Sequence, residues 1–245
     1  MIADPSCPKC HGSGFIVKKD EKGYEYAEKC DCTFNYSKKI KLKSAKIPKR
    51  YGNCNFNNYK PMNDSQEKAL KSAKKFSADY PSVSGGIFFQ GPAGVGKTHL
   101  SIAIIKELIE RKGVDALFYD VRDLISEIQS KINIDAEGYN KILERVYNVD
   151  VLILDDIGAH RISDWTEDII SKIINKRYNN KKITIFSSNY MDAKEFYDDL
   201  AEVKGESLEE RIGYRLRSRM YEMSRLIILR GADFRKKYLK NTINI

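Results

Sequence analysis

An eight-residue stretch, GPAGVGKT at residues 91–98, constrains the fold of this chain more than any other part of its sequence. It fits the pattern G-x-x-x-x-G-K-[ST] at every fixed position, with an apolar strand-like run before it and a helical pattern after it. In this setting the glycines allow backbone N–H groups to point at phosphate oxygens. The Lys97 ammonium would reach the β- and γ-phosphates of ATP, and the Thr98 hydroxyl can bind Mg²⁺. The residues expected to bind this cofactor are Gly91, Pro92, Ala93, Gly94, Val95, Gly96, Lys97, Thr98 and His99.

From about residue 61 the sequence alternates between helical and strand-like patterns. Strands alternating with helices predict an α/β fold, in which a parallel sheet is covered by helices on both faces. We expect Asp64 to cap the first helix and Gly113 to end the second. Strands are expected at 85–90, 116–120, 150–155, 182–189 and 225–229, and helices at 64–80, 97–113, 121–132, 136–148, 166–180 and 208–223.

Two adjacent acids, Asp155 and Asp156, follow the apolar run VLIL. Because a phosphate-binding loop holds its nucleotide at the carboxyl ends of parallel strands, a carboxylate that ends a neighbouring strand would face the bound Mg²⁺. Asp155 fits this magnesium role together with Thr98, and Asp156 would lie beside the γ-phosphate and activate the attacking water. Asn189 ends the next expected strand, and its amide could orient that water.

The basic residues are concentrated near the N-terminus. The chain carries a net charge of +9, and residues 1–60 hold 13 Lys/Arg against 6 Asp/Glu, so this segment alone contributes +7. Residues 33–60 contain eight basic residues and no acidic one. Such a segment suits a polyanion or an acidic protein face, or is a solvated basic linker. We expect a small module at 1–35, a basic linker at 36–60 and one larger domain at 61–245.

Four of the five cysteines lie close together, as the pairs Cys7-x₂-Cys10 and Cys30-x-Cys32 separated by nineteen residues. In a reducing compartment this clustering favours a metal over disulfides. Four thiolates would form a tetrahedral structural zinc site that folds the intervening turn and short hairpin. Because the second pair has one spacer residue, His11 is a substitute ligand, and free thiols or redox chemistry are the alternatives. Cys54 is expected to be a buried apolar residue.

The composition indicates a globular protein outside the membrane. Hydrophobic residues make up 42% of the chain and charged residues 31%, and no window approaches the roughly 18 apolar residues of a membrane span. The start MIADPSCPKC lacks the apolar core of a signal peptide. We expect a cytoplasmic location.

Four motifs together resemble a known family. GPAGVGKTHL, VLILDDIGA, ITIFSSNY and ERIGYRLRSRMYEM resemble the AAA+ ATPases that load the bacterial replicative helicase, the DnaC/DnaI type within the IstB-like ATP-binding superfamily. The resemblance runs from about Ile47 to Phe234, and IPKRYGNCNF is similar to the segment before that family's ATPase core. It implies an ATP-dependent loader acting in the initiation of DNA replication, with a DnaB-type helicase, single-stranded DNA and further copies of the chain as partners.

The resemblance also implies roles for particular residues. Asn189 would be sensor 1, and Arg235 lies near the position of sensor 2. Arg219 falls at the arginine finger, which reaches the nucleotide of a neighbouring subunit and so implies an ATP-dependent ring or spiral. The finger assignment stays open among clustered arginines. These are Arg211, Arg215, Arg217 and Arg219.

Asp156 departs from the Asp-Glu pair of many AAA+ proteins. Its side chain is one methylene shorter than Glu, so its reach to the attacking water is less secure. We therefore expect slow hydrolysis, suited to a nucleotide-timed switch.

The loader resemblance implies a ring whose inner surface grips single-stranded DNA. Trp165, the only tryptophan, could stack on a base, and Ser163 could donate to a phosphate. The alternative for Trp165 is packing against the core. Basic side chains at Lys131, Lys141 and Arg161 could line a groove, although such residues on helices are usually only solvated. Some DnaI-type loaders carry an N-terminal zinc module that contacts the helicase, which implies a similar role here.

Two other functions fit parts of the sequence. A transposition helper ATPase of the IstB type shares the same core, but usually begins with a helical domain instead of a cysteine module. A binding module with an inactive ATPase site is the other alternative. Intact Lys97, Thr98 and Asp155 argue against it, whereas Asp156 keeps it open.

Overall fold

Five parallel strands form the sheet at the centre of the structure, a computed structural model that describes residues 3–132, 134–159, 163–191 and 206–235. The spatial order is β4-β5-β6-β3-β7, so β3 lies between strands that come later in the chain. The expected α/β fold with a parallel sheet is confirmed. The strands are β3 (Gly86–Gln90), β4 (Ala116–Asp120), β5 (Val151–Asp155), β6 (Ile183–Ser188) and β7 (Ser224–Ile228).

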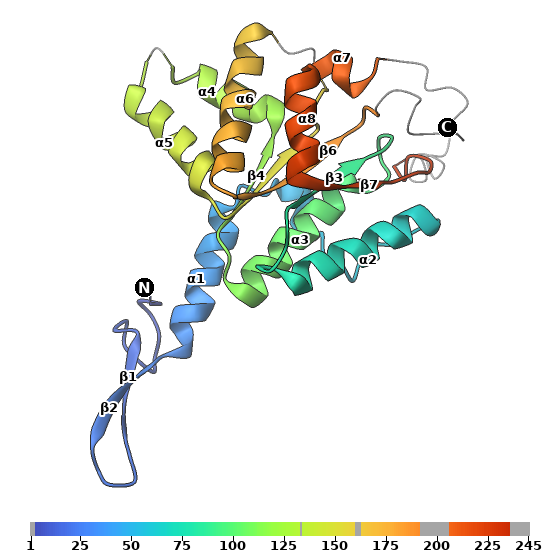
Figure 1. Cartoon of the computed structure of the whole chain (residues 1–245). Helices are drawn as coiled ribbons and strands as arrows, with labels where there is room; N and C mark the ends of the chain where they lie inside the picture. The colour runs from blue at the N-terminus through green and yellow to red at the C-terminus, as the bar shows by residue number, and fades with distance from the viewer. Residues whose placement is uncertain (1–2, 133, 160–162, 192–205, 236–245) are drawn as a thin grey trace, which may run out of the picture.

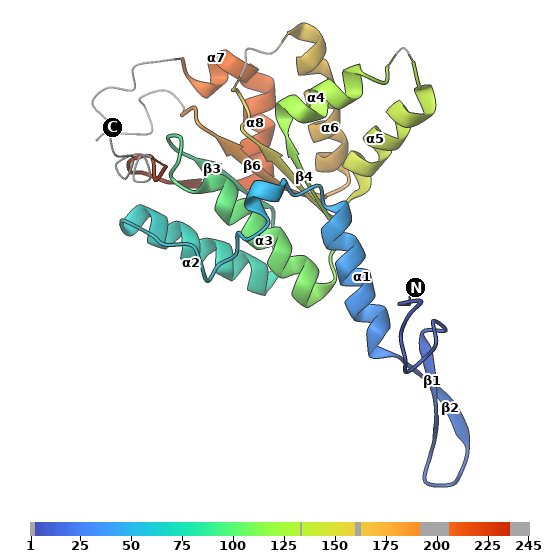
Figure 2. The same cartoon turned by 180° about the vertical axis from the view of Figure 1, so that it is seen from behind.

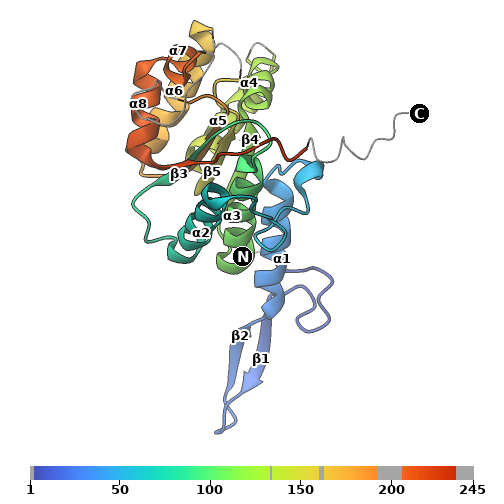
Figure 3. The same ribbon diagram turned by 90° about the vertical axis from the view of Figure 1, so that its right-hand side faces the viewer.

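Helices cover both faces of this sheet (Figures 1 and 3). The strands bury side chains on both faces, so the core divides into two clusters, one on each side of the sheet. One face is covered by α1 (Asp31–Ser44), α2 (Asp64–Asp79) and α3 (Lys97–Lys112). The other is covered by α4 (Val121–Gln129), α5 (Ala136–Asn148), α6 (Asp164–Asn179), α7 (Leu208–Ile212) and α8 (Tyr214–Met223).

Several helix boundaries differ from the sequence-based expectation, for example α4, which ends at Gln129, and two of the differences have a clear local cause. Asn63, not Asp64, caps α2, because its side chain accepts the Gln66 amide while Asp64 is already the first helical residue. The helix expected at 208–223 is two helices, because Gly213 interrupts it with φ 80°. Gly113 ends α3 in the left-handed conformation, as expected.

The N-terminal segment forms a separate arm. An antiparallel hairpin of β1 (Phe15–Lys19) and β2 (Glu25–Lys29) projects away from the sheet, and α1 connects it to the larger domain (Figures 1 and 2). Helix α1 runs through residue 35, where composition predicts a boundary between the small module and the basic linker. The three-way division of the chain stays a prediction.

A fully buried arginine fixes the start of β6, the strand that leads to Asn189. Arg177 donates to the carbonyl oxygens of Val146 and Val149 at 2.8 and 2.9 Å, and to Ile183 at 2.6 Å. It therefore ties the end of α5 to the first residue of β6, with backbone carbonyls in place of a carboxylate partner. None of the helices in the described part of the chain is long and apolar enough to cross a membrane.

Candidate functional site

A cavity of about 620 Å³ opens beside the carboxyl ends of the strands, within the range of small-molecule sites. Seven of the nine expected cofactor-binding residues, those at 93–99, line it, together with Asp155, Asp156 and Asn189. Five cations and three carboxylates are among its lining residues, which suits a nucleotide that carries several negative charges. The cations are Arg50, Lys60, Lys97, Arg122 and Arg235, and the carboxylates are Asp120, Asp155 and Asp156.

The loop at 91–98 needs glycine at its tightest points. Gly96 has φ 100°, and a Cβ there would lie 2.6 Å from the Tyr59 ring. At Gly91 a Cβ would lie 2.0 Å from the Leu229 carbonyl oxygen. Packing on both sides therefore holds the loop against β7 and against the segment before α2.

Lys97 is buried at the centre of the loop. Its ammonium donates to the carbonyl oxygens of Gly91 and Pro92 at 2.7 and 2.8 Å, and to Asn189 Oδ1 at 2.7 Å. Gly91 and Pro92 contribute these carbonyls although neither residue lines the cavity. Burial lowers the pKa of Lys97 to about 8, and the nearby Asp155 and Asp156 partly offset this effect. A phosphate would favour the charged ammonium, because it supplies an opposite charge.

Thr98 and Asp155 form the expected magnesium-side pair. Thr98 Oγ1 donates to Asp155 Oδ2 at 2.9 Å, and Ser187 donates to the same carboxylate. Burial raises the pKa of Asp155, while the hydrogen bonds from Ser187 and Thr98 lower it. Two ligand oxygens on one octahedral Mg²⁺ lie roughly 3 Å apart. The spacing of Thr98 Oγ1 and Asp155 Oδ2 therefore fits that ion.

Asp156 and Asn189 meet beside Lys97. Asn189 donates through Nδ2 to Asp156 Oδ1, while its Oδ1 accepts from Lys97. Asp156 has φ 61°, an unusual backbone conformation for a residue other than glycine and one that clusters at functional sites. Arg122 Nη2 lies 3.7 Å from the other Asp156 oxygen. The catalytic roles of these residues stay predictions.

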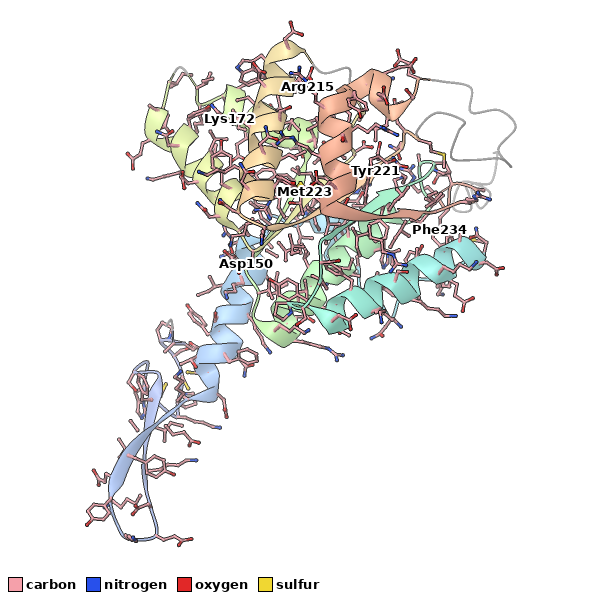
Figure 4. All side chains as sticks on the ribbon, in the orientation of Figure 1. Asp150, Lys172, Arg215, Tyr221, Met223 and Phe234 are labelled. Atoms are coloured by element: carbon pink, nitrogen blue, oxygen red, sulfur yellow. The ribbon has the colours of Figure 1, made fainter. Side chains whose placement is uncertain are left out.

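The two predicted arginines lie in different places. Arg235 lines the cavity and pairs with Asp233 at 2.8 Å, which raises the pKa of Arg235. Arg219 is outside the cavity, on the exposed side of α8, where it donates to Asn175. Figure 4 shows Arg215 on the same helix and Phe234 beyond the end of β7.

Two of the other clustered arginines, Arg211 and Arg217, form ion pairs within the chain. Arg217 lies 3.4 Å from Glu209, and Arg211 lies 2.6 Å from Glu206. Arg215, like Arg219, is exposed. The exposed pair is therefore better placed to reach another subunit, although the finger assignment stays a prediction.

His99 lines the cavity from the first turn of α3. Its Nε2 lies 2.9 Å from the Asn55 carbonyl oxygen, and its ring meets Tyr59 edge-on. Burial lowers the pKa of His99, which favours the neutral ring.

The four clustered cysteines converge at the base of the hairpin. Their sulfur atoms all lie within 4.8 Å of one another, with Cys7 and Cys30 3.8 Å apart and Cys10 and Cys32 3.4 Å apart. In a tetrahedral zinc site with Zn–S near 2.3 Å, sulfur atoms are separated by about 3.8 Å. The cluster therefore fits zinc. Among the described residues, His11 is not part of this cluster. Cys54 is half-buried against the core instead of fully buried.

The residues expected to face DNA have structural roles as well. Ser163 caps α6 by accepting the Thr166 amide, and the half-buried Trp165 packs against the core. Lys131 and Lys141 form ion pairs within their own segments, with Asp135 and Glu137 respectively. Arg161 lies outside the described residues. DNA binding by these residues stays a prediction.

Sequence analysis missed several residues that line the cavity or bind its acids. Ser187 lies two residues before Asn189 at the end of β6, and Arg122 follows the end of β4. Because the carboxyl ends of parallel strands meet at one edge of the sheet, both could have been predicted to lie near the site. Arg50, Tyr51 and Tyr59 precede the first strand of the sheet, so no strand-end signal marks them.

Comparison with known proteins relates the whole site to one family. The sequence model of the family described as IstB-like ATP binding protein matches residues 33–204. The replicative helicase loader DnaC of Buchnera aphidicola subsp. Schizaphis graminum is 35% identical over 147 residues, which cover 58% of each chain. The DnaC of Escherichia coli K12 is 31% identical over 137 residues, or 56% of each chain. The chain thus spans little more than half the length of these curated relatives.

Solved structures extend the similarity. A crystal structure of the DnaC helicase loader is 38% identical, with a TM-score of 0.65, and the match covers 74% of this chain and 99% of that one. A crystal structure of DnaI is 25% identical, with a TM-score of 0.59 and coverage of 77% and 94%. The family match extends over more than half of the sequence and includes the loop, the paired acids and Asn189. This chain belongs to the IstB-like ATP binding protein family.

Proposed function

We propose that this protein is an ATP-dependent loader of the replicative DNA helicase. The proposal rests on one observation. The hydrogen-bonded pairs Lys97–Asn189 and Thr98–Asp155 lie together on a fold that matches 99% of a DnaC helicase loader structure. The curated relatives cited above are named replicative helicase loaders. They therefore do not favour the transposition-helper alternative.

The cavity supports ATP binding and hydrolysis as follows. Lys97 and the loop amides bind the phosphates, and Thr98 and Asp155 hold the Mg²⁺, which neutralises charge on the β- and γ-phosphates when bound. Asn189 orients the attacking water, and Asp156 accepts its proton. Because Asp156 is short and already hydrogen-bonded to Asn189, hydrolysis is slow.

The cysteine cluster supports a structural zinc site in the N-terminal module. The sulfur spacing fits a tetrahedral ion, and a hairpin of two short strands has too little apolar surface to fold alone. Zinc supplies folding free energy to such a module when it is bound. The module would present exposed apolar side chains to the helicase, namely Phe15, Val17, Tyr24 and Tyr26.

Self-association completes the proposed ATPase site. Arg219 does not line the cavity of its own chain, so an arginine finger at this position could reach only the nucleotide of another subunit. Arg219 of one subunit would therefore act on the nucleotide of the next, in a ring or spiral that assembles with ATP. Arg235 contributes from within the chain as sensor 2. Ser163 and Trp165 would bind single-stranded DNA on the inner surface.

Affinity capture with the replicative helicase of the same cell tests the proposal. The full chain should retain the helicase when ATP is present. A Phe15→Asp/Val17→Asp double variant should lose it, because both exposed side chains lie on one face of β1. The control is Ile134→Asp, which places one negative charge on another exposed apolar residue and should leave capture unchanged. Failure of the full chain to bind the helicase would refute the loader proposal.

A further inference from the structure

Arg50 is a charged residue of the cavity wall to which none of the roles above is assigned. It belongs to the short helix η1 (Lys49–Tyr51), which precedes the α/β domain in the chain. Among the described residues, no carboxylate lies within ion-pair distance of its guanidinium. By contrast, Arg122 and Arg235 in the same wall are paired with Asp120 and Asp233. Arg50 is therefore a cation whose charge is not balanced by a carboxylate of the wall.

The guanidinium of Arg50 points toward the magnesium side of the cavity. It lies over the Tyr51 ring, 4.4 Å from the ring centroid, and donates to the Tyr51 hydroxyl. The electrostatic neighbours of that hydroxyl include Asp155 and Thr98, the proposed magnesium residues. Since Mg²⁺ bridges the β- and γ-phosphates, Arg50 is on the side where the terminal phosphate would lie.

The segment before η1 is anchored to the edge of the sheet. The Ala45 carbonyl oxygen accepts the Phe118 amide of β4 at 2.8 Å, and Ala45 is fully buried. Lys46 forms an ion pair with Glu127 of α4 at 2.7 Å. These contacts fix the chain between α1 and η1.

The segment after η1 is anchored to α3. The Gly52 carbonyl oxygen accepts from Lys106 Nζ at 2.6 Å, and the Asn55 carbonyl oxygen lies 2.9 Å from His99 Nε2. Helix η1 is thus held on both sides. Before it the chain is bonded to β4, the neighbour of the strand that ends at Asp155, and after it the chain is bonded to α3, which follows the phosphate-binding loop. The position of Arg50 on the cavity wall is a consequence of the fold and not of a loose surface loop.

We propose that Arg50 binds the γ-phosphate of ATP and so couples the nucleotide state to the segment that joins α1 to the α/β domain. A guanidinium can bind two phosphate oxygens at once, and Arg50 would approach the phosphate from the Tyr51 side of the cavity. ADP lacks this phosphate, so Arg50 would distinguish the two nucleotides. The inference rests on the proposed ATP site.

The test compares nucleotide affinities of the full chain by calorimetry, with Mg²⁺ and either ADP or a non-hydrolysable ATP analogue. Arg50→Ala should lower the affinity for the ATP analogue roughly 10- to 100-fold, the loss expected when a charged hydrogen-bonding group is removed. The affinity for ADP should not change. Arg50→Lys should give an intermediate loss. Lys49→Ala is the matched control, because Lys49 is exposed on the same helix but does not line the cavity. An equal loss for both nucleotides, or no loss, would overturn the inference.

Lys97→Ala separates this inference from the proposed function. If the wild-type chain binds both nucleotides and Lys97→Ala binds neither, the ATP site stands, and the Arg50 result decides the inference alone. If the wild-type chain binds neither nucleotide, both fail. Hydrogen exchange at residues 41–51 provides a second readout. The ATP analogue should protect this segment more than ADP does, and Arg50→Ala should abolish the difference. A difference that persists in Arg50→Ala would overturn the coupling.

Discussion

At the scale of single residues, the two adjacent acids have distinct environments. Asp155 is buried and accepts from Thr98 and Ser187, whereas Asp156 is half-exposed and accepts from Asn189. The two neighbouring carboxylates differ because the strand ends at Asp155 and the chain turns at Asp156 with φ 61°. This difference agrees with the separate magnesium and water roles that we propose for them.

Asp155→Asn should stabilise the nucleotide-free protein and abolish Mg²⁺-dependent ATP hydrolysis. Burial raises the pKa of Asp155, so the folded state keeps its proton to higher pH than the unfolded chain does. The contribution of the protonated Asp155 to stability is then fully present below its pKa in the unfolded chain and is lost as the pH rises through its pKa in the folded protein. The neutral amide of Asn avoids that loss, and we expect the free energy of unfolding to increase by about 0.5–2 kcal/mol at pH 7. Thermal unfolding at several pH values measures it. A destabilised Asn variant would contradict the account.

Asp156→Glu should accelerate hydrolysis several-fold. The additional methylene would extend the carboxylate toward the attacking water, whereas the shorter Asp156 side chain is held by its hydrogen bond to Asn189. Single-turnover ATP hydrolysis measures the effect, with Asp156→Asn as the control that removes the base. Equal rates for the Glu and Asp proteins would show that the shorter side chain does not limit the reaction.

The sequence was sufficient to predict the site residues that belong to local motifs. Lys97, Thr98, Asp155 and Asn189 were identified from spacing and strand ends, and the structure brings them together. The hydrogen bond from Lys97 to Asn189 joins residues that are 92 positions apart. It depends on the order of the strands in the sheet and could therefore not be predicted from a local sequence pattern.

At the scale of elements, helix α8 and the N-terminal hairpin are the parts that we propose contact other molecules. Helix α8 buries Leu216 and Met220 while it exposes Arg215 and Arg219. Helical periodicity predicted this segment, but not its interruption at Gly213, which separates α7 from α8. A capping box at Ser207 begins α7. The short helix η1 has no periodic pattern, which explains why sequence reasoning did not assign it to the cavity.

Arg219→Ala should bind ATP normally but lose hydrolysis. Mixing it with Lys97→Ala should restore part of the activity, because the second protein supplies Arg219 to the intact pocket of the first. Steady-state hydrolysis of the separate and mixed proteins measures this complementation. The same mixture made with Arg215→Ala tests the neighbouring exposed arginine. Wild-type hydrolysis by Arg219→Ala alone would assign the finger to another residue.

Metal analysis of the full chain should find about one zinc ion per molecule. Cys30→Ser should lose the ion, since Cys30 is the most deeply buried of the clustered cysteines, whereas Cys54→Ser should retain it. Chelation should lower the thermal stability of the hairpin module and leave ATP binding intact. A folded, zinc-free protein would rule out the structural metal site.

At the scale of the whole molecule, the chain joins an α/β domain, which contains the nucleotide-site residues, to an arm that carries the cysteine cluster. The parallel sheet and its helices were predictable from the alternation of patterns, because each strand is apolar and each helix amphipathic. The attachment of the arm was not predictable. It depends on Ala45 pairing with the edge of β4 and on η1 lying against the cavity, both of which are long-range contacts of a basic segment without apolar periodicity.

The most direct test of the account is a helicase-loading assay on closed circular single-stranded DNA. Because a closed circle has no end to thread, a ring-shaped helicase needs a loader to enter it. We predict that the full chain with ATP places the replicative helicase on the circle, and that Lys97→Ala does not. Loading by Lys97→Ala at the wild-type level, or no loading by the wild-type chain, would contradict the account.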